Sequence, residues 1–325
     1  MRRREFIAGL GSAAAWPKLM RAQQSMPVVG ILQPGSRETE GPLGDAALRG
    51  LAEAGYVEGR NLLVVRSYAV GQYDRLALLA VELARRNVNV IVTTGGLNTA
   101  LAAKAATTTI PIVFETGVNP VEAGLVSSLN RPGGNMTGIT DLNLELTAKR
   151  LQMLRELVPS VALVAVLVNP ANRATEGIVK QLEAAAPILG VHLLVVNVGA
   201  RSDFELAFAT LVDQKAGAIL STADPIFFNQ LEQFITLASR HSMPVIYPFR
   251  QATKLGGLMS YGADVPDAMR LVGTYAGRIL KGEKPADLPV QQSTKVELMI
   301  NLKTAMTLGL MVPQALIVAA NEIVE

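Results

Sequence analysis

The chain has 325 residues, of which 50% are hydrophobic and 18% are charged, so it can bury a sizeable core and is not intrinsically disordered. The absence of cysteine excludes disulfides, thiolate metal sites and a cysteine nucleophile. The net charge of +3 comes from the first 22 residues, which hold five basic residues and one acidic residue. The other 25 basic and 26 acidic residues nearly balance, so we expect no nucleic-acid partner.

The first residues of the chain have the pattern of an export signal. The motif RREFI begins at Arg3, and residues 6–16 form a short, weakly apolar stretch. A basic start followed by such a stretch is typical of a signal peptide, whereas a membrane span needs about 20 apolar residues. We therefore expect residues 1–25 to be a twin-arginine signal peptide and the protein to reside in the periplasm without stable membrane insertion.

From residue 27 onward, short β-branched runs alternate with amphipathic helical patterns. The runs occupy residues 28–32, 62–65, 88–92, 110–114, 163–168, 191–196, 218–220 and 244–247. Apolar residues recur at helical spacing between them, at residues 76–83, 151–157 and 231–238. Continuous apolar runs predict strands buried on both faces, and their alternation with helices predicts parallel sheets with right-handed crossovers.

The runs fall into two series, at about 27–118 and 142–249, with a turn-rich segment at 130–135 between them. We therefore predict an α/β protein of two Rossmann-like lobes with parallel sheets, joined by a hinge. Lobe I is expected to comprise residues 26–141 plus about 250–287, and lobe II residues 142–249 plus about 288–325. The segments after residue 250 are expected to complete these lobes and not to start a third domain.

Polar and aromatic residues at the carboxyl ends of the predicted strands are candidate ligand contacts, because open parallel sheets bind ligands at that edge. The candidates in the first lobe are Gln33, Thr94, Gly95 and Asn98. Those in the second lobe are Asn169, Asp224, Tyr247 and Phe249, and Tyr261 is a further aromatic candidate. Two such edges that face each other would form a cleft able to hinge shut on a small solute.

Each candidate also has a purely structural interpretation. Residues 94–96 precede a predicted helix whose free N–H groups attract an anion, but an ordinary turn with a threonine cap explains them equally. Asp224 before Pro225 fits a helix cap, and the same carboxylate could pair with a ligand ammonium. The three aromatic candidates suit either pocket walls or the core, and the remaining amides suit either a turn or a polar contact.

Four segments of the chain resemble a known family. They are residues 114–138 (FETGVNPVEAGLVSSLNRPGGNMTG), 247–250 (YPFR), 256–262 (GGLMSYG) and 278–290 (RILKGEKPADLPV). With the leader that ends in RAQQ, they resemble the ABC transporter substrate-binding proteins of the tryptophan/tyrosine type, over essentially the whole chain. The family usually carries an aspartate where this chain has Asn119, so Asn119 is a candidate contact that lacks the family's charge.

The resemblance implies a type I periplasmic-binding fold, a small-molecule ligand, and a membrane permease with its ATPase as partners. The ligand classes to consider are amino acids and aromatic acids. We expect a monomer that binds its solute without a cofactor. His192 and His241 have no neighbours at metal-ligand spacing, so we expect no metal site.

Two other functions compete with solute binding. The first is a small-molecule enzyme on the same two-lobe frame, but the sequence has no nucleophile elbow, phosphate-binding lysine motif or metal cluster. The second is a ligand-responsive transcription regulator, which needs a DNA-reading helix-turn-helix module. The 26 residues before the first predicted strand carry the export pattern instead. We therefore predict a binding protein and not an enzyme.

Overall fold

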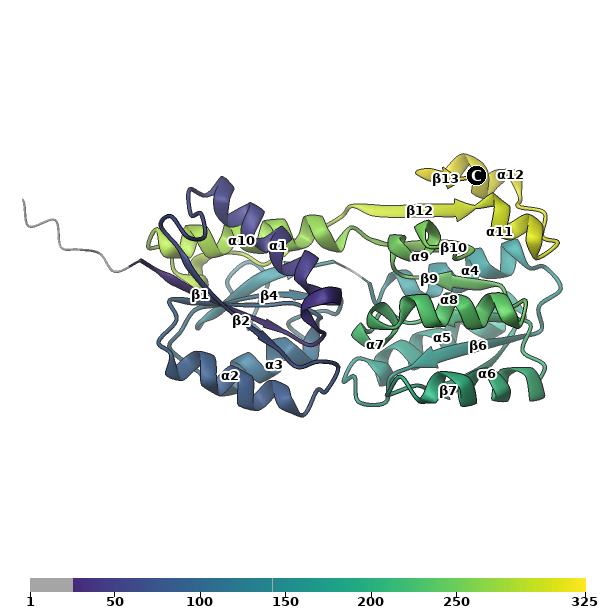
Figure 1. Ribbon diagram of the computed structural model, residues 1–325, viewed down its shortest axis with the longest axis horizontal. Coiled ribbons are helices and arrows are strands. Elements are labelled where there is room, and N and C mark those ends of the chain that lie inside the picture. Colours follow the sequence, from purple (N-terminus) through teal and green to yellow (C-terminus); the bar gives the residue numbers. More distant parts are fainter. Residues whose placement is uncertain (1–25, 142) are drawn as a thin grey trace, which may run out of the picture.

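Two sheets form from the β-branched runs and stand side by side in a two-lobed molecule, shown by the computed structural model in Figure 1. The structure describes residues 26–141 and 143–325, so the predicted signal peptide lies outside the described residues. The prediction of a two-lobe α/β fold is confirmed, with mostly parallel sheets covered by helices on both faces.

The first lobe has a six-stranded, all-parallel sheet in the order β11-β5-β4-β3-β1-β2. Its elements are β1 (Val28–Gln33), α1 (Arg37–Glu53), β2 (Leu63–Tyr68), α2 (Arg75–Arg85), β3 (Val90–Thr93), α3 (Leu97–Ala106), β4 (Ile112–Thr116), β5 (Met136–Thr140), α10 (Val265–Leu280), the 3-10 helix η1 (Pro285–Asp287) and β11 (Gln291–Gln292). Because the strands are parallel, their carboxyl ends meet at one edge, and this edge faces the second lobe.

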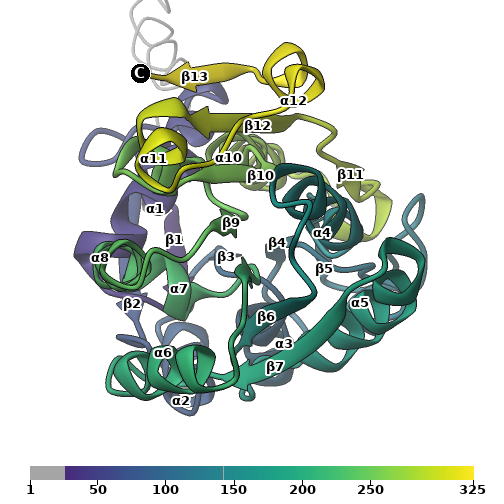
Figure 2. The ribbon, with the colours of Figure 1, turned by 90° about the vertical axis from the view of Figure 1, so that its right-hand side faces the viewer.

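The second lobe has a seven-stranded sheet in the order β13-β12-β10-β9-β8-β6-β7, in which the β10–β12 pair is antiparallel and every other pair is parallel. Its elements are α4 (Leu146–Leu157), β6 (Leu163–Val168), α5 (Thr175–Leu189), β7 (His192–Asn197), α6 (Asp203–Asp213), β8 (Ala218–Ser221), α7 (Pro225–Asn229), α8 (Leu231–Arg240), β9 (Val245–Tyr247), α9 (Arg250–Lys254), β10 (Met259–Ala263), β12 (Val296–Asn301), α11 (Leu302–Thr307), α12 (Gln314–Ala319) and β13 (Glu322–Val324). Figure 2 shows α4 and α5 on one side of this sheet and α6 and α8 on the other.

The strands β2 and β7 correct one detail of the sequence prediction. Both come from continuous apolar runs, which predicted burial on both faces. Each is instead the last strand of its sheet, and its side chains are mostly half-exposed or exposed. A continuous apolar run indicates that a segment forms a strand of a sheet. The position of that strand in the strand order decides how far neighbouring elements bury its side chains.

The lobe boundaries also differ from those expected. Residues 250–263 were expected in the first lobe, but β10 pairs with β9 and β12 and so belongs to the second sheet. Residues 288–292 were expected in the second lobe, but β11 pairs with β5 of the first sheet, and Leu288 is buried in the first-lobe core. The chain therefore crosses between the sheets three times, after β5, after β10 and between β11 and β12.

Helices α1 and α10 pack unusually closely across the first lobe. A Cβ atom added at Gly50 would lie 1.8 Å from the Arg270 carbonyl oxygen, and one at Gly273 would lie 1.8 Å from the Ala47 carbonyl oxygen. Both distances are far shorter than van der Waals contact, so the backbones meet only because these positions lack side chains. This contact fixes α10, which starts directly after the second crossing, against the first lobe.

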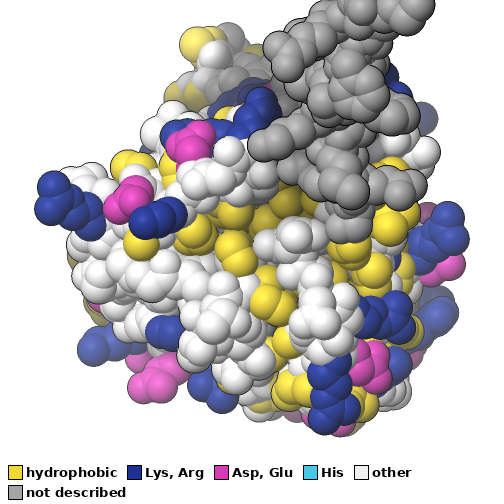
Figure 3. All heavy atoms as spheres, turned by 90° about the vertical axis from the view of Figure 1, so that its left-hand side faces the viewer, with side chains coloured by type: hydrophobic (Ala, Val, Ile, Leu, Met, Phe, Trp, Pro, Cys, Tyr) yellow, Lys and Arg dark blue, Asp and Glu magenta, His cyan; other side chains and the backbone are white. Residues whose placement is uncertain are grey.

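The outer end of the first lobe shows apolar side chains among charged ones (Figure 3). Met26, just before β1, and Leu63, at the start of β2, are 42% and 46% exposed. They lie at the amino ends of their strands and therefore on the side away from the cleft. Within the described residues, none of the helices combines the length and the apolar character that crossing a membrane requires.

Candidate functional site: an inter-lobe cavity

A cavity lies between the lobes, where the carboxyl ends of the two sets of strands face each other. Its first-lobe walls come from α1, the turn before α3 and the segments after β4 and β5, and include Glu40, Leu43, Gly95, Gly96, Glu115, Thr116, Val118 and Asp141. Its second-lobe walls include Arg150, Asn172, Ile178, Asp224, Phe228, Phe249 and Arg250. Both lobes thus contribute charged and apolar groups, as expected for a site that binds one small molecule.

Three buried carboxyl groups form the first-lobe side of the cavity. Glu40, Glu115 and Asp141 are 2%, 5% and 1% exposed, and no Lys, Arg or His side chain of the described residues lies within ion-pair distance of them. Glu40 accepts a hydrogen bond from the Thr94 hydroxyl at 3.1 Å. Asp141 accepts two from Asn143, from its backbone N–H at 3.2 Å and from its side-chain amide at 2.8 Å.

Burial makes the ionised forms of these groups costly. It raises the pKa of Glu40 to about 7. It raises the pKa of Glu115 well above the ordinary value, and the negative charges of Asp141 and Glu40 raise it further. Burial also raises the pKa of Asp141. A cation placed among these three carboxylates would relieve their repulsion, so this side of the cavity attracts positive charge.

Arg150, on α4 of the second lobe, supplies a buried positive charge to the cavity and is close enough to Asp141 to oppose part of the rise in the pKa of that carboxyl. Its Nη2 donates to the Asn143 carbonyl oxygen at 2.8 Å and to the Thr147 hydroxyl at 2.9 Å, and its Nη1 donates to the Tyr261 carbonyl oxygen at 3.2 Å. Burial lowers the pKa of Arg150 to about 10, so it stays charged at neutral pH. Its Nε is buried and has no hydrogen-bond partner among the described residues. This arrangement favours an anionic group on the Arg150 side.

Asp224 faces the cavity, but its acceptor positions are already occupied. Its Oδ1 accepts from the Asn169 side-chain amide at 3.0 Å and from the Ile226 backbone N–H at 2.8 Å. Its Oδ2 accepts from the Asn172 side-chain amide at 2.7 Å and from the Tyr73 hydroxyl at 2.9 Å. A carboxylate has about four acceptor positions, so all of them are used. Asp224 therefore caps α7 and leaves no free position for a ligand ammonium.

An aromatic pair forms part of the second-lobe wall. The rings of Phe228 and Phe249 meet edge to face, with centroids 5.1 Å apart and planes at 69°. Apolar side chains from both lobes line the cavity with them, including Leu43, Val118 and Ile178. Such a wall suits a flat apolar group.

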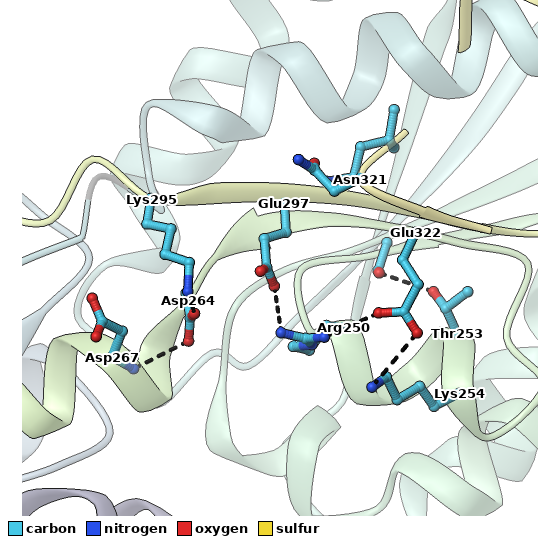
Figure 4. Close-up of polar contacts among 11 residues, drawn as sticks. Arg250, Thr253, Lys254, Asp264, Asp267, Lys295, Glu297, Asn321 and Glu322 are labelled. Atoms are coloured by element: carbon cyan, nitrogen blue, oxygen red, sulfur yellow. Dashed lines mark hydrogen bonds and ion pairs between the residues drawn. The ribbon is translucent and has the colours of Figure 1, made fainter. Parts of the chain in front are cut away.

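Arg250 also lines the cavity, but two carboxylates already offset its charge (Figure 4). Its Nη1 lies 2.7 Å from Glu297 Oε2 on β12, and its Nη2 lies 3.1 Å from Glu322 Oε2 on β13. Lys254 also pairs with Glu322, at 3.6 Å. The C-terminal strand thus anchors one residue of the cavity wall, and among the described residues that line the cavity Arg150 is the cation that forms no ion pair.

Two of the three crossings are joined side by side at the hinge (Figure 4). The Asp264 backbone N–H donates to the Lys295 carbonyl oxygen at 3.0 Å, and the Lys295 ammonium forms an ion pair with the Asp264 carboxylate. The same carboxylate caps α10 by accepting from the Asp267 N–H at 3.1 Å. The two crossings are therefore tied together where they connect the lobes.

Of the ten predicted contact residues, Gly95, Asp224 and Phe249 line the cavity. Seven do not: Gln33, Thr94, Asn98, Asn119, Asn169, Tyr247 and Tyr261. Three of the seven support residues that do. The Gln33 side-chain amide donates to the Glu40 carbonyl oxygen at 2.6 Å, Thr94 bonds the Glu40 carboxylate, and Asn169 bonds Asp224.

The other four have roles away from the cavity wall. Tyr247 is 1% exposed and packs its ring on Phe234 in the second-lobe core, with centroids 5.1 Å apart. Tyr261 packs against the core on the other face of the same sheet. Asn119 shapes its own loop, and Asn98 bonds the backbone of the second lobe. Of the two interpretations considered for Tyr247 and Tyr261, packing in the core therefore fits their positions.

The sequence reasoning did not select Glu40, Asp141, Arg150 and Phe228 as contacts. One of them carried a usable signal. Arg150 lies four residues before Leu154 and three after Thr147, on the buried stripe of α4. A charged residue on an apolar helix face requires buried partners, so it is a candidate for a site. Glu40 and Asp141 carried no comparable signal, because nothing local indicates that they face the other lobe.

The two hinged α/β lobes and the charged and aromatic cavity between them define the class of two-lobed solute-binding proteins. The sequence matches the family model described as "ABC transporter substrate binding protein" over residues 5–324. The chain therefore belongs to the ABC transporter substrate-binding protein family and is a solute-binding protein. Among the described residues, no three His, Cys, Asp or Glu side chains form a group that could hold a metal ion.

Individual relatives agree with this assignment. A "Tyrosine-binding protein" of Clostridioides difficile (strain R20291) is 26% identical over 280 residues, which are 85% of this chain and 80% of that protein. The crystal structure of a conserved domain protein from Vibrio cholerae O1 biovar eltor is 28% identical, with a TM-score of 0.84, covering 92% of this chain and 100% of that one. A Streptococcus pneumonia ABC domain in complex with L-Trp is 24% identical, with a TM-score of 0.83 and the same coverage.

Proposed function

We propose that this protein captures a small solute that carries an ammonium group and a flat apolar part, such as an aromatic amino acid. The observation that carries the proposal is the group of three buried carboxyls, Glu40, Glu115 and Asp141, which have no paired cation among the described residues. A ligand ammonium would supply that cation, Arg150 would face a ligand carboxylate, and the Phe228–Phe249 pair would pack on the flat part.

The relative named for tyrosine binding supports the same class, because tyrosine has all three features. We propose further that residues 1–25 direct export through the twin-arginine route and that the protein delivers its solute, as a monomer, to a permease with its ATPase. The described hydroxyls that line the cavity do not support catalysis: Thr116 bonds a backbone N–H, and Thr147 bonds the Asn143 carbonyl oxygen and Arg150, so neither is paired with a carboxylate base. Solute capture remains the better account of the cavity.

Replacing Glu115 with glutamine is expected to weaken the binding of aromatic amino acids about ten- to a hundred-fold. The substitution removes a charge-assisted hydrogen bond worth about 1.5–3 kcal/mol. The deamino analogue of the same amino acid, for example 3-(4-hydroxyphenyl)propionate beside L-tyrosine, should not be weakened. A thermal-shift screen of amino acids and aromatic acids identifies ligands, and calorimetry then measures both affinities.

Glu122→Gln is the matched control, because Glu122 lies in the same region of the first lobe, is exposed and does not line the cavity. It should leave both affinities unchanged. Glu115→Gln should also raise the free energy of unfolding, since folding otherwise requires either a buried charge beside two carboxyls or the uptake of a proton. Equal losses for the amino acid and its deamino analogue would contradict the proposed ammonium contact.

The affinity for an aromatic amino acid is expected to rise with pH between about pH 5 and pH 8. An ammonium binds the ionised carboxylates, whereas the raised pKa of Glu115 and the Glu40 pKa of about 7 keep these groups partly protonated near neutral pH. Binding must therefore release protons, and affinity falls as pH is lowered through this window. The other charged groups that face the cavity are Asp141, Arg150, Asp224 and Arg250, and burial raises the pKa of both aspartates.

Calorimetry at pH 6 in two buffers of different ionisation enthalpy measures the protons released. Without ligand the sign is opposite: carboxyls whose pKa is raised by folding stabilise the folded state most when protonated, so their contribution declines as pH rises through the same window. Ligand-free protein should therefore lose stability from pH 5 to pH 8 while its ligand affinity increases. A pH-independent affinity would argue against the carboxyl group as the ammonium site.

A further inference from the structure

We propose that Tyr73 and Asn98, two first-lobe residues outside the cavity, are positioning residues that hold the lobes together and set the affinity for every solute. They would change the affinity for all solutes by the same factor and would leave the selectivity among solutes unchanged. This inference rests on solute binding between the lobes but not on the chemistry of the ligand. It comes from three hydrogen bonds that cross the cleft and that the cavity walls do not need.

Asn98 uses both ends of its side-chain amide to reach the second lobe. It lies in the first turn of α3, its Nδ2 donates to the Ala171 carbonyl oxygen at 2.8 Å, and its Oδ1 accepts from the Arg173 N–H at 3.0 Å. Both partners are backbone groups of the loop between β6 and α5. That loop is held in shape from within, because the side chains of Asn169 and Asn172 each accept from a backbone N–H two residues on.

Tyr73 makes the second connection. Its ring packs against the first-lobe core, and its hydroxyl donates to Asp224 Oδ2 across the cleft at 2.9 Å. Three donors from the second lobe already hold that carboxylate in place. Burial and the charge of Asp224 raise the pKa of the Tyr73 phenol well above its ordinary value, so it remains a donor at neutral pH. Neither Tyr73 nor Asn98 lines the cavity.

The three hydrogen bonds lie far from the crossings, so they form only when the two lobes are closed. In Figure 1 the crossing that leads from β11 into β12 runs along the upper edge of the molecule, whereas α2 and α3 lie along the lower edge. Tyr73 lies just before α2, and Asn98 lies in the first turn of α3. A rotation about the crossings opens the lower edge most and breaks all three hydrogen bonds. A ligand that needs both walls binds only the closed form, so its apparent dissociation constant is divided by the closed fraction.

Spin labels can report closure without any ligand, because the sequence contains no cysteine that would compete for labelling. Leu78 on α2 and Leu206 on α6 are 62% and 73% exposed. The two helices lie along the lower edge of the first and the second lobe in Figure 1. The pair Leu78→Cys and Leu206→Cys, introduced into the full chain, places one label on each lobe. The distance distribution between the labels then measures the ratio of closed to open protein.

Asn98→Ala is expected to lower the closed-to-open ratio about three- to ten-fold, and Tyr73→Phe, which removes a bond to a charged group, about ten-fold or more. Asn119→Ala is the control, because Asn119 bonds only residues of its own loop and should leave the distribution unchanged. Circular dichroism establishes that each variant is folded. Folded Asn98→Ala and Tyr73→Phe proteins with the same distance distribution as the parent would overturn the proposal.

Binding measurements supply an independent check. With L-tyrosine and its deamino analogue as probes, both variants should weaken the two ligands by the same factor, whereas Glu115→Gln should change the ratio between them. A variant of Tyr73 or Asn98 that altered the ratio would make that residue a specificity contact and contradict our inference. If L-tyrosine did not bind at all, the proposed ligand would be wrong, but the label distances of the ligand-free protein would still decide the role of Tyr73 and Asn98.

Discussion

Gly273→Ala is expected to lower the free energy of unfolding by about 3 kcal/mol or more, because no flexible group can move aside for the new methyl. Its Cβ would lie 1.8 Å from the Ala47 carbonyl oxygen and 2.9 Å from the Leu51 backbone nitrogen. Both are main-chain atoms of α1. Helices α1 and α10 would have to separate, which would loosen the core around Met269 and Val272.

The matched control is Gly177→Ala in α5, where an added Cβ meets no atom within 4 Å. Alanine is the better helix former, so this variant should gain about 0.5–1 kcal/mol. Urea unfolding of the two variants and the parent protein gives both values directly. If Gly273→Ala unfolded within about 0.5 kcal/mol of the parent, the close packing of α1 on α10 would not have the importance that we assign to it.

Arg150→Met is expected to cost about 3–5 kcal/mol of stability and to abolish high-affinity binding of amino acids. The loss arises because the side chain is 1% exposed and donates to Asn143, Thr147 and Tyr261, whose buried oxygens would lose their partner. The positive charge that lowers the pKa of Asp141 would also disappear, leaving the carboxyl groups of the cavity without a nearby cation. The proposed partner of the ligand carboxylate would be lost at the same time.

Lys149→Met is the corresponding control on the same helix, since Lys149 is exposed and bonds only Gln152. It should change stability by less than about 0.5 kcal/mol. Arg150→Lys separates charge from geometry: lysine keeps the charge but cannot reproduce the planar fork, so it should restore only part of the stability. Denaturant unfolding and calorimetry with L-tyrosine measure the two effects. Wild-type stability in Arg150→Met would show that the buried hydrogen bonds contribute little.

The two-lobe α/β fold was predictable from the sequence because its signals are local. Runs such as residues 163–168 and 218–220 became β6 and β8, and Asp224 followed by Pro225 caps α7 as the pattern indicated. The side-chain preference of a strand or a cap depends on residues a few positions apart, so one sequence contains it. The order of the strands within each sheet was harder to predict from the sequence. The edge positions of β2 and β7, and the sheets joined by β10 and β11, depend on pairings between distant segments.

The candidate site, too, has features that local sequence patterns predicted and features that depend on contacts between distant segments. The cavity lies at the carboxyl ends of the strands, where ligand contacts were predicted, and Gly95, Asp224 and Phe249 line it. Glu40 and Arg150 come from helices and were not predicted. Arg150 carried a local signal, its place on the buried stripe of α4, whereas only the packing of one lobe against the other decides that Glu40 faces the cleft. Asn98 was predicted to contact the ligand, and its side chain bonds the backbone of the opposite lobe.

The sequence by itself determined the alternation of strands and helices, the family and the edge of each sheet at which the inter-lobe cavity lies. Only the tertiary structure decided that Asp224 has no free acceptor position, that three carboxyls share one side of the cavity, and that Tyr73 reaches across the cleft. Secondary structure follows from interactions within a few residues, whereas each of these features joins atoms that are many residues apart in the chain. Their energies depend on burial and distance, which exist only once the two lobes have folded and met.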